Sequence, residues 1–241
     1  NTWLHVSTDM EWRESQAFLK APWRGVTLPN PVRVGDSAAD QPAASRPVFT
    51  IGFLSRIDPK KGLDILIRAL SGVSFDYRLK IAGSGEESYI GQLKQLAAEC
   101  GNADKIEWTG PRYHREKFDF FRNLDLFALT SRNENFALVV IESLSVGTPV
   151  LVSREVGLAP YVHERDLGWV TGISPGAVTA GLELAWMDRE KRLRVRTQSA
   201  QIVRNDFDGE PIIDQYCRFY TGLVQRGTPP SHHAEVIPLT N

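Results

Sequence analysis

The sequence predicts an α/β fold with a parallel sheet and crossover helices, and three observations support that prediction. Strand-length apolar runs alternate with segments of helical periodicity between Val48 and Ser153. The runs LFAL and PVLV are apolar throughout, which is typical of strands buried on both faces. The chain has 241 residues, 42% of them hydrophobic, so it can bury a core without disulfides or metals.

Each element of this pattern has its own signal. Residues 48–54 form an apolar run that predicts a buried strand, and residues 62–70 follow with helical periodicity. Residues 78–82 predict a strand that ends at a Gly-Ser-Gly turn, and residues 87–99 predict a helix because their apolar residues share one face. The remaining predicted elements are strands 105–108, 125–130 and 149–153 and helices 114–122, 137–146, 177–186, 189–204 and 211–224.

Composition divides the chain into four parts. Residues 1–34 predict a short strand, a polar turn and a helix, and residues 48–225 form the main domain. Residues 35–47 are small, polar and Pro-containing, which predicts a linker, although a long surface loop stays open as an alternative. Residues 226–241 predict a flexible tail. The chain begins with Asn rather than Met, so we expect a fragment or a processed product.

Charge and cysteine content limit the classes of function. The net charge of −1 gives no general attraction to nucleic acid or to anionic lipid. Cys100 and Cys217 lie too far apart to predict a disulfide framework or a metal site, and so few thiols favour a reducing compartment. No targeting segment is recognisable. We therefore expect a cytoplasmic protein without nucleic-acid partners.

Polar, glycine-rich segments follow several predicted strands, at the edge where open α/β sheets bind ligands. Arg56 and Lys61 flank a turn that opens a helix, which favours a phosphate site, with a solvated basic turn as the alternative. Gly83 and Gly85 would let backbone N–H groups approach a ligand, with a plain turn as the alternative. The segment containing Arg112 and Tyr113 could lie against a planar base, although a structural turn is favoured by that segment alone.

The strongest segment runs from Thr130 to Pro149 and carries Glu134 and Glu142. Eight residues are about two helical turns, so groups near the start of this segment and Glu142 can face the same side. Glu142 lies in the apolar stretch ALVVIESL, and a carboxylate there needs a partner, for which ligand hydroxyls would serve. Backbone N–H groups at the helix start would face the same ligand; they belong to Asn135, Phe136, Ala137 and Leu138. The alternative is a helix capped by Asn135 or Glu134, with Glu142 in a structural salt bridge.

Taken together, these segments resemble the nucleotide-sugar-binding half of a GT-B glycosyltransferase of the retaining family 4 (group 1). The matching elements are Arg56 with Lys61-Gly62, Gly83-Ser-Gly85, the pair Glu134 and Glu142, and Gly147-Thr-Pro149-Val. The resemblance runs from about Val48 to Val170, and residues 1–34 look like the end of the family's acceptor domain and its crossover. Two departures stand out: Ala137 replaces a usual glycine, and Ser143 replaces a common alanine.

The resemblance implies a Rossmann-like sheet with helices on both faces and closing C-terminal helices. It implies transfer of a hexose from a UDP- or GDP-linked sugar to a glycan or lipid-linked acceptor, with no metal or other cofactor. Arg56 and Lys61 would bind the diphosphate, Glu134 a sugar hydroxyl and Glu142 the ribose. The other implied donor-binding residues are Gly83, Gly85, Arg112, Tyr113, Asn135, Phe136, Ala137 and Leu138.

Other interpretations stay open. A sugar-nucleotide epimerase of the same architecture and a binding module without turnover both fit these segments. A Rossmann oxidoreductase is disfavoured because the full dinucleotide fingerprint is missing. The basic residues 189–196 could contact the inner face of a membrane holding a lipid-linked acceptor, although a solvated helix face is favoured. Asp206-Phe-Asp208 lies between predicted helices, so we reject it as a metal site.

Overall fold

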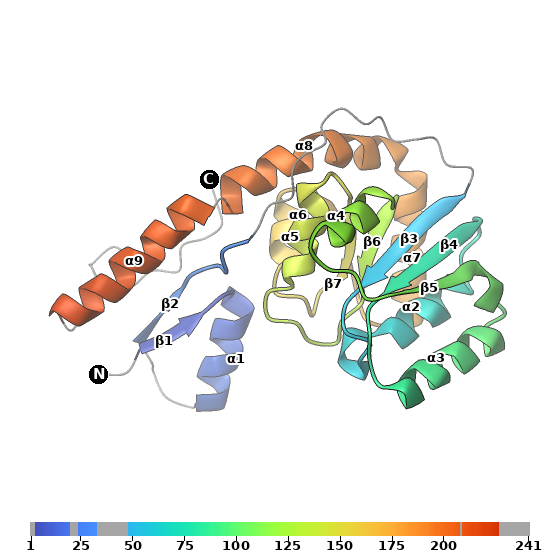
Figure 1. Cartoon of the computed structure of the whole chain (residues 1–241), viewed down its shortest axis with the longest axis horizontal. Coiled ribbons are helices and arrows are strands. Elements are labelled where there is room, and N and C mark those ends of the chain that lie inside the picture. Colours follow the sequence, from blue (N-terminus) through green and yellow to red (C-terminus); the bar gives the residue numbers. More distant parts are fainter. Residues whose placement is uncertain (1–2, 20–23, 33–47, 208, 227–241) are drawn as a thin grey trace.

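The computed structural model describes residues 3–19, 24–32, 48–207 and 209–226. A six-stranded parallel sheet dominates it, with strand order β5-β4-β3-β6-β7-β8 (Figure 1). Its strands are β3 Phe49–Leu54, β4 Tyr77–Ala82, β5 Ile106–Gly110, β6 Leu126–Leu129, β7 Val150–Ser153 and β8 Gly168–Thr171. Counted from β3, this is the doubly wound order 3-2-1-4-5-6, so the predicted Rossmann-like α/β fold is confirmed.

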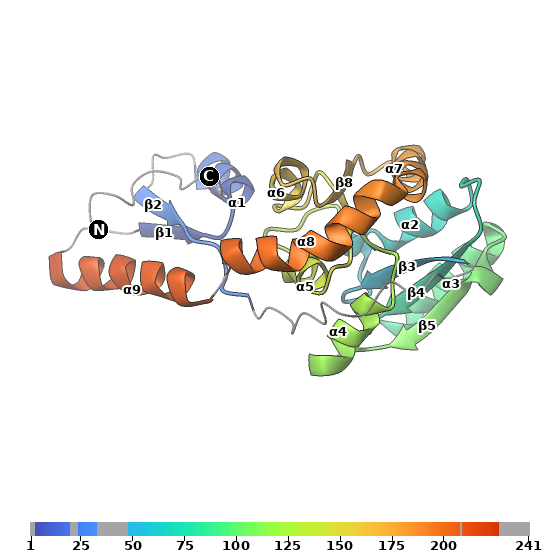
Figure 2. The same ribbon diagram turned by 90° about the horizontal axis from the view of Figure 1, so that it is seen from above.

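Helices cover both faces of this sheet. Helix α2 contacts α3 and α7 on one face, while α4 contacts α5 on the other and α8 packs against α5 (Figures 1 and 2). Every residue of β3, β6 and β7 is buried, which explains why these strands are apolar throughout. The bounds are α2 Leu63–Leu70, α3 Glu87–Glu99, α4 His114–Arg122, α5 Leu138–Ser145, α6 Ala159–Glu164, α7 Pro175–Met187 and α8 Arg189–Phe207, with short 3₁₀ turns at Pro59–Lys61 and Ala103–Lys105.

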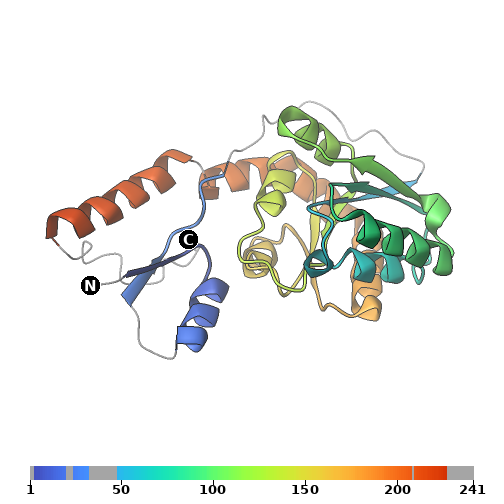
Figure 3. The ribbon, with the colours of Figure 1, turned by 60° about the horizontal axis from the view of Figure 1, so that its bottom comes forward.

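A smaller unit lies beside the main sheet. It holds the parallel pair β1 Trp3–Val6 and β2 Arg24–Thr27, together with α1 Asp9–Leu19. Helix α9, Gly209–Arg226, returns from the end of the main unit to this pair (Figure 3). Phe219 of α9 is 1% exposed and packs in a cluster with Val26 and Leu28. The sequence assigned α9 to the main domain, residues 48–225, but in the structure this helix packs on the smaller unit formed by residues before 35.

The sequence patterns missed three elements: β2, α6 and β8. Each is only four to six residues long, and β8 has the sequence GWVT, in which two of the four residues are not fully buried. Such short segments carry too few apolar positions to show a period. The predicted linker 35–47 and residues 227–241 of the predicted tail lie outside the described residues, so the four-part division stays a prediction.

Candidate functional site

The site lies where the loops that follow β3 and β6 meet. These strands are neighbours, and the helices that follow them lie on opposite faces of the sheet, α2 on one and α5 on the other, which makes this the topological switch point. Lys61, at the end of the β3–α2 turn, forms an ion pair with Glu134 of the β6–α5 loop. The two side chains are 13% and 21% exposed. Two residues that are far apart in the sequence thus share one edge of the sheet.

The backbone of Glu134 is held by the loop that follows β7. Its N–H donates to the carbonyl of Glu155 over 2.9 Å, and its carbonyl accepts from the N–H of Gly157 over 2.7 Å. A parallel bridge joins Glu134 to Val156. The carboxylate therefore projects from a fixed backbone, and Oε2 takes the contact with Lys61. Among the described residues, Oε1 of Glu134 has no hydrogen-bond partner.

A second ion pair joins helices α4 and α5. Glu142 of α5 is 8% exposed and pairs with Lys117 of α4 through Oε1. The ion pair that the sequence left open for Glu142 is therefore present, with a lysine that the motifs did not identify. Lys117 lies 25 positions before Glu142, on a different helix, so no sequence period connects them. The remaining carboxylate oxygens, Oε1 of Glu134 and Oε2 of Glu142, accept no hydrogen bond from the described residues.

Helix α5 begins at Leu138 rather than at Ala137, and Ala137 has the left-handed backbone φ 62°, ψ 64°. No side chain caps this helix, so the alternative of capping by Asn135 or Glu134 is wrong. The Asn135 amide instead donates to Glu11 of α1 over 3.1 Å. A left-handed alanine costs about 1–2 kcal/mol. This local strain falls at the position where the resemblance implies glycine.

A groove borders each of the two loops that carry Lys61 and Glu134. The first, of about 370 Å³, lies between the smaller unit and the β6–α5 loop, and its lining residues are His5, Val6, Ser7, Glu11, Asn30 and residues 134–138. The second, of about 470 Å³, lies between the turns that follow β3 and β4 and includes Arg56 and Gly85. Arg56 is exposed, and its side chain makes no hydrogen bond or ion pair to the described residues. Arg56 and Glu134 thus line different grooves.

Comparison with known proteins decides the family. The family model described as "Glycosyl transferases group 1" matches residues 38–201, which is most of the chain. The chain belongs to this family. D-inositol 3-phosphate glycosyltransferases from Mycobacterium tuberculosis (strain F11) and Corynebacterium glutamicum (strain R) are 33% and 32% identical over 176 and 163 residues. These alignments cover 68% and 64% of the chain but only 36% and 39% of the relatives, so the chain spans well under half of their length.

Solved structures show the same fold. Sucrose-phosphate synthase from Thermosynechococcus elongatus matches with a TM-score of 0.80 and 20% identity over 92% of this chain and 58% of that chain. HepE from Anabaena, solved in complex with UDP and glucose, matches with a TM-score of 0.78 and 20% identity over 91% of this chain and 63% of that chain. The predicted group 1 resemblance and GT-B architecture are therefore confirmed.

In this group 1 glycosyltransferase chain, Gly83 and Gly85 have a structural reason that does not involve a ligand. A Cβ on Gly83 would lie 1.9 Å from the carbonyl oxygen of Ser55, and a Cβ on Gly85 would lie 2.0 Å from that of Ile57. The backbones of the two turns touch here, and the N–H of Ile57 donates to Ser84 over 2.8 Å. The glycines are required for this close approach, and their role toward a donor stays a prediction.

The remaining predicted residues lie in three different environments: beside an edge strand, in the core and on the first groove. Arg112 and Tyr113 follow β5, the edge strand, which is two strands away from β3, and Tyr113 is 63% exposed. Their proximity to a base stays a prediction. Phe136 is buried and packs edge-to-face on Phe207, so its side chain belongs to the core. Leu138 is 42% exposed on the first groove.

The basic stretch 189–196 is less solvated than expected. The guanidinium of Arg192 lies 5.0 Å from the ring centroid of Phe49, and Arg196 donates to the carbonyl of Leu124 over 2.6 Å. Lys191 pairs with Asp166. Lys191, Arg192 and Arg196 therefore bind groups of the same chain, whereas Arg189 and Arg194 are exposed. Contact of this stretch with a membrane stays a prediction.

Asp206 of α8 is held by hydrogen bonds within the chain, and the described residues contain no candidate metal cluster. Asp206 accepts from the Tyr161 hydroxyl and from Arg165, each over 2.9 Å, which gives this carboxylate a structural role. Within residues 3–19, 24–32, 48–207 and 209–226, no three His, Cys, Asp or Glu side chains gather to hold a metal ion. In those same ranges, every helix is too short or too polar to cross a bilayer.

Proposed function

We propose that this chain is the donor-binding half of a glycosyltransferase that moves a hexose from a nucleoside-diphosphate sugar to a glycan or lipid-linked acceptor. One observation supports it above the others: the ion pair of Lys61 with Glu134 at the switch point of the sheet. A cation suited to a diphosphate lies beside a carboxylate suited to a sugar hydroxyl. The two ends of a sugar–phosphate bond would thus be recognised side by side.

Each remaining role follows from position and chemistry. Lys61, together with Arg56 on the neighbouring groove, would bind the diphosphate, since ammonium and guanidinium groups donate strong hydrogen bonds to phosphate oxygens. Glu134 would accept from a sugar hydroxyl through Oε1, and Glu142 would accept from the ribose hydroxyls through Oε2. The uncapped start of α5 adds backbone N–H groups beside Glu134.

The chemistry we propose is electrostatic. Breaking the sugar–phosphate bond places negative charge on the leaving diphosphate, and cations already in place would stabilise it. Each charged hydrogen bond contributes about 1.5–3 kcal/mol. These cations would make a metal ion unnecessary. An acceptor hydroxyl would attack the anomeric carbon on the face that the diphosphate leaves, and its proton would pass to the leaving diphosphate. This attack would retain the anomeric configuration without a nucleophilic side chain.

The choice of donor rests on the comparisons, and the acceptor is a separate part of the proposal. Anabaena HepE was solved with UDP and with UDP-glucose, so a UDP-linked hexose is the first donor to test and a GDP-linked one the second. The curated relatives are named D-inositol 3-phosphate glycosyltransferases. We propose a cytoplasmic enzyme that meets a lipid-linked acceptor at the inner face of the membrane.

Calorimetric titration of the chain with UDP, GDP, ADP and their sugar conjugates tests the proposal. One nucleotide should bind, and Glu142→Gln should weaken it about tenfold or more, since a hydrogen bond to a charged group is lost. Glu183→Gln is the matched control, because Glu183 lies on α7, away from the switch point, and accepts from the hydroxyl of Ser74. Failure of every nucleotide to bind, or equal binding by both variants, would contradict the proposed site.

Turnover of the intact enzyme separates catalysis from binding. Arg56→Ala and Lys61→Ala should lower kcat by about 100-fold, because the charge they meet develops in the transition state. Unchanged kcat in both variants would refute their role. The anomeric configuration of the product, read by NMR, tests retention.

A further inference from the structure

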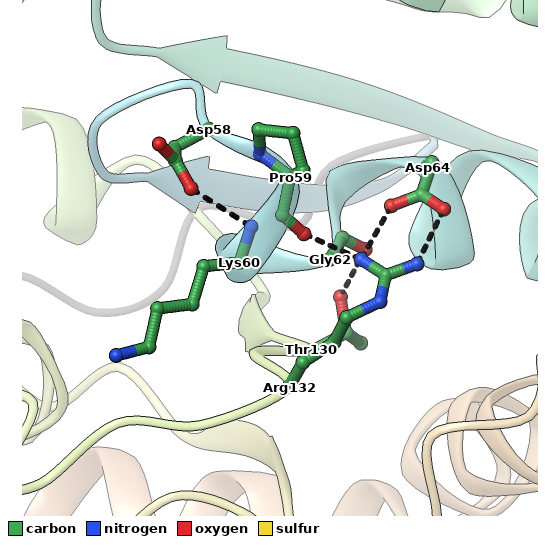
Figure 4. Close-up of polar contacts among 7 residues, drawn as sticks. All are labelled: Asp58, Pro59, Lys60, Gly62, Asp64, Thr130 and Arg132. Atoms are coloured by element: carbon green, nitrogen blue, oxygen red, sulfur yellow. Dashed lines mark hydrogen bonds and ion pairs between the residues drawn. The ribbon is translucent and has the colours of Figure 1, made fainter.

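Arg132 has no part in the proposed chemistry, yet it lies two residues before Glu134 on the same loop. Its guanidinium donates to both carboxylate oxygens of Asp64, over 2.9 and 2.7 Å, in a bidentate pair. The same Nη1 also donates to the carbonyl of Pro59. Figure 4 shows the guanidinium between the β3–α2 turn and the first turn of α2. One side chain of the β6–α5 loop therefore binds two points on the segment that carries Lys61.

Backbone contacts hold the same segment on either side of Lys61. The N–H of Arg132 donates to the carbonyl of Lys60 over 2.8 Å, and the hydroxyl of Thr130 donates to the carbonyl of Gly62 over 2.8 Å. The residues before and after Lys61 are thus both bound by residues 130–132. These contacts fix the distance between the Lys61 and Glu134 backbones.

The pairing of Arg132 with Asp64 is specific in its geometry. A bidentate guanidinium–carboxylate pair fixes orientation as well as distance, which a lysine cannot do. The hydrogen bond to Asp64 raises the pKa of Arg132. A surface ion pair on its own contributes little to folding stability. Its position beside the site suggests a different use.

We propose that Arg132 and Asp64 are positioning residues that set the Lys61 ammonium against Glu134 for glycosyl transfer. The proposal rests on the function proposed above, because Lys61 must act on the donor for its placement to matter. A displacement of about 1 Å at reacting groups can lower a rate by about 100-fold. Loss of the pair should therefore lower turnover more than it lowers stability or nucleotide affinity.

The test uses Arg132→Met and Asp64→Asn in the intact enzyme. Lys105→Met is the matched control, since it breaks the 3.1 Å ion pair with Asp76. Both residues lie at the amino ends of strands, opposite the edge that carries the site. We expect kcat to fall by about 10- to 100-fold in both site variants, with KM and the UDP dissociation constant changed by less than about threefold. The control should keep its kcat.

Combination with Lys61→Ala distinguishes positioning from general stability. If Arg132 acts through Lys61, then Arg132→Met should lower kcat by less than about twofold in the Lys61→Ala background. Full additivity would overturn the proposal, and so would an Arg132→Met enzyme with the kcat of the wild type. If Arg132→Met does not fold, Asp64→Asn, which keeps the shape of the side chain, decides the same question. Wild-type protein without nucleotide binding or transfer would instead contradict the proposed function.

Discussion

Substitution of Gly62 by alanine tests the contact between the two loops of the site. Gly62 has φ +67°, and a Cβ there would lie 2.0 Å from the carbonyl oxygen of Thr130. Thr130 is fully buried in the β6–α5 connection, and backbone cannot turn aside as a side chain can. Gly62→Ala must therefore push apart the loops that carry Lys61 and Glu134.

A matched glycine separates the collision from the backbone strain. Gly101 has φ +68°, and a Cβ there meets no atom of the described chain within 4 Å. Gly101→Ala should therefore cost only the left-handed strain, about 1–2 kcal/mol. Gly62→Ala adds overpacking of about 1–3 kcal/mol, which gives a loss of about 2–5 kcal/mol in the free energy of unfolding.

Two measurements on both variants read out this difference. The midpoint temperature of thermal unfolding, Tm, should fall by about 2–4 °C for each kcal/mol lost in a chain of this size. The kcat of the intact enzyme should fall in Gly62→Ala and stay unchanged in Gly101→Ala, because only the first variant displaces Lys61. Equal loss of stability in the two variants would refute the reasoning, since the collision with Thr130 would then have no energetic weight.

Three further predictions concern the neighbouring residues. Lys117→Met should lower the free energy of unfolding by about 1–3 kcal/mol, because it leaves the nearly buried carboxylate of Glu142 without its cation, and urea denaturation should show this loss reduced in the double variant with Glu142→Gln. Ala137→Val should cost about 1–3 kcal/mol in thermal unfolding, whereas Ala137→Gly should not, because a β-branched residue tolerates φ 62° poorly. Lys191 lowers the pKa of Asp166, so that ion pair stabilises the fold above the unfolded pKa of about 3.9, and this stability is lost as the pH falls through the lower folded pKa. Denaturation between about pH 5 and pH 2 should therefore be less acid-sensitive, by under about 1 kcal/mol, in Asp166→Asn.

The sheet and most helices could be predicted because burial leaves a direct pattern in the sequence. Strands β3, β6 and β7 are buried at every position, and the bounds of α3 and α4 were predicted to the residue. Strands β2 and β8 were not predicted, because four residues of mixed polarity show no hydrophobic period. Helix α9 was predicted as a helix, but its partner was not, since an amphipathic face does not say which surface it covers.

The placement of Lys61 and Glu134 at one edge of the sheet could be predicted, whereas the contacts around them could not, and the functional roles of these residues stay predictions. Lys61 and Glu134 each follow a strand, and the doubly wound order places those two loops together. The Lys117 partner of Glu142 could not be found, because the pair joins two helices and depends on how they pack. Arg132 and Asp64 were missed for the same reason: they lie 68 positions apart in the sequence and meet only in the folded chain.

Three glycines near the site mark contacts between the backbones of neighbouring loops. Gly62, Gly83 and Gly85 all follow strands and invite the interpretation of a backbone open to a ligand. In the structure, each of them faces a carbonyl oxygen of a neighbouring loop within 2.0 Å of where a Cβ would lie. A glycine at this edge of a parallel sheet therefore indicates close approach without saying whether a phosphate or another loop makes it. At Gly62 the partner is the loop that carries Glu134, so placement of the two proposed donor-binding groups depends on a contact between backbones, and substitutions at such positions should disturb the site without removing any functional side chain.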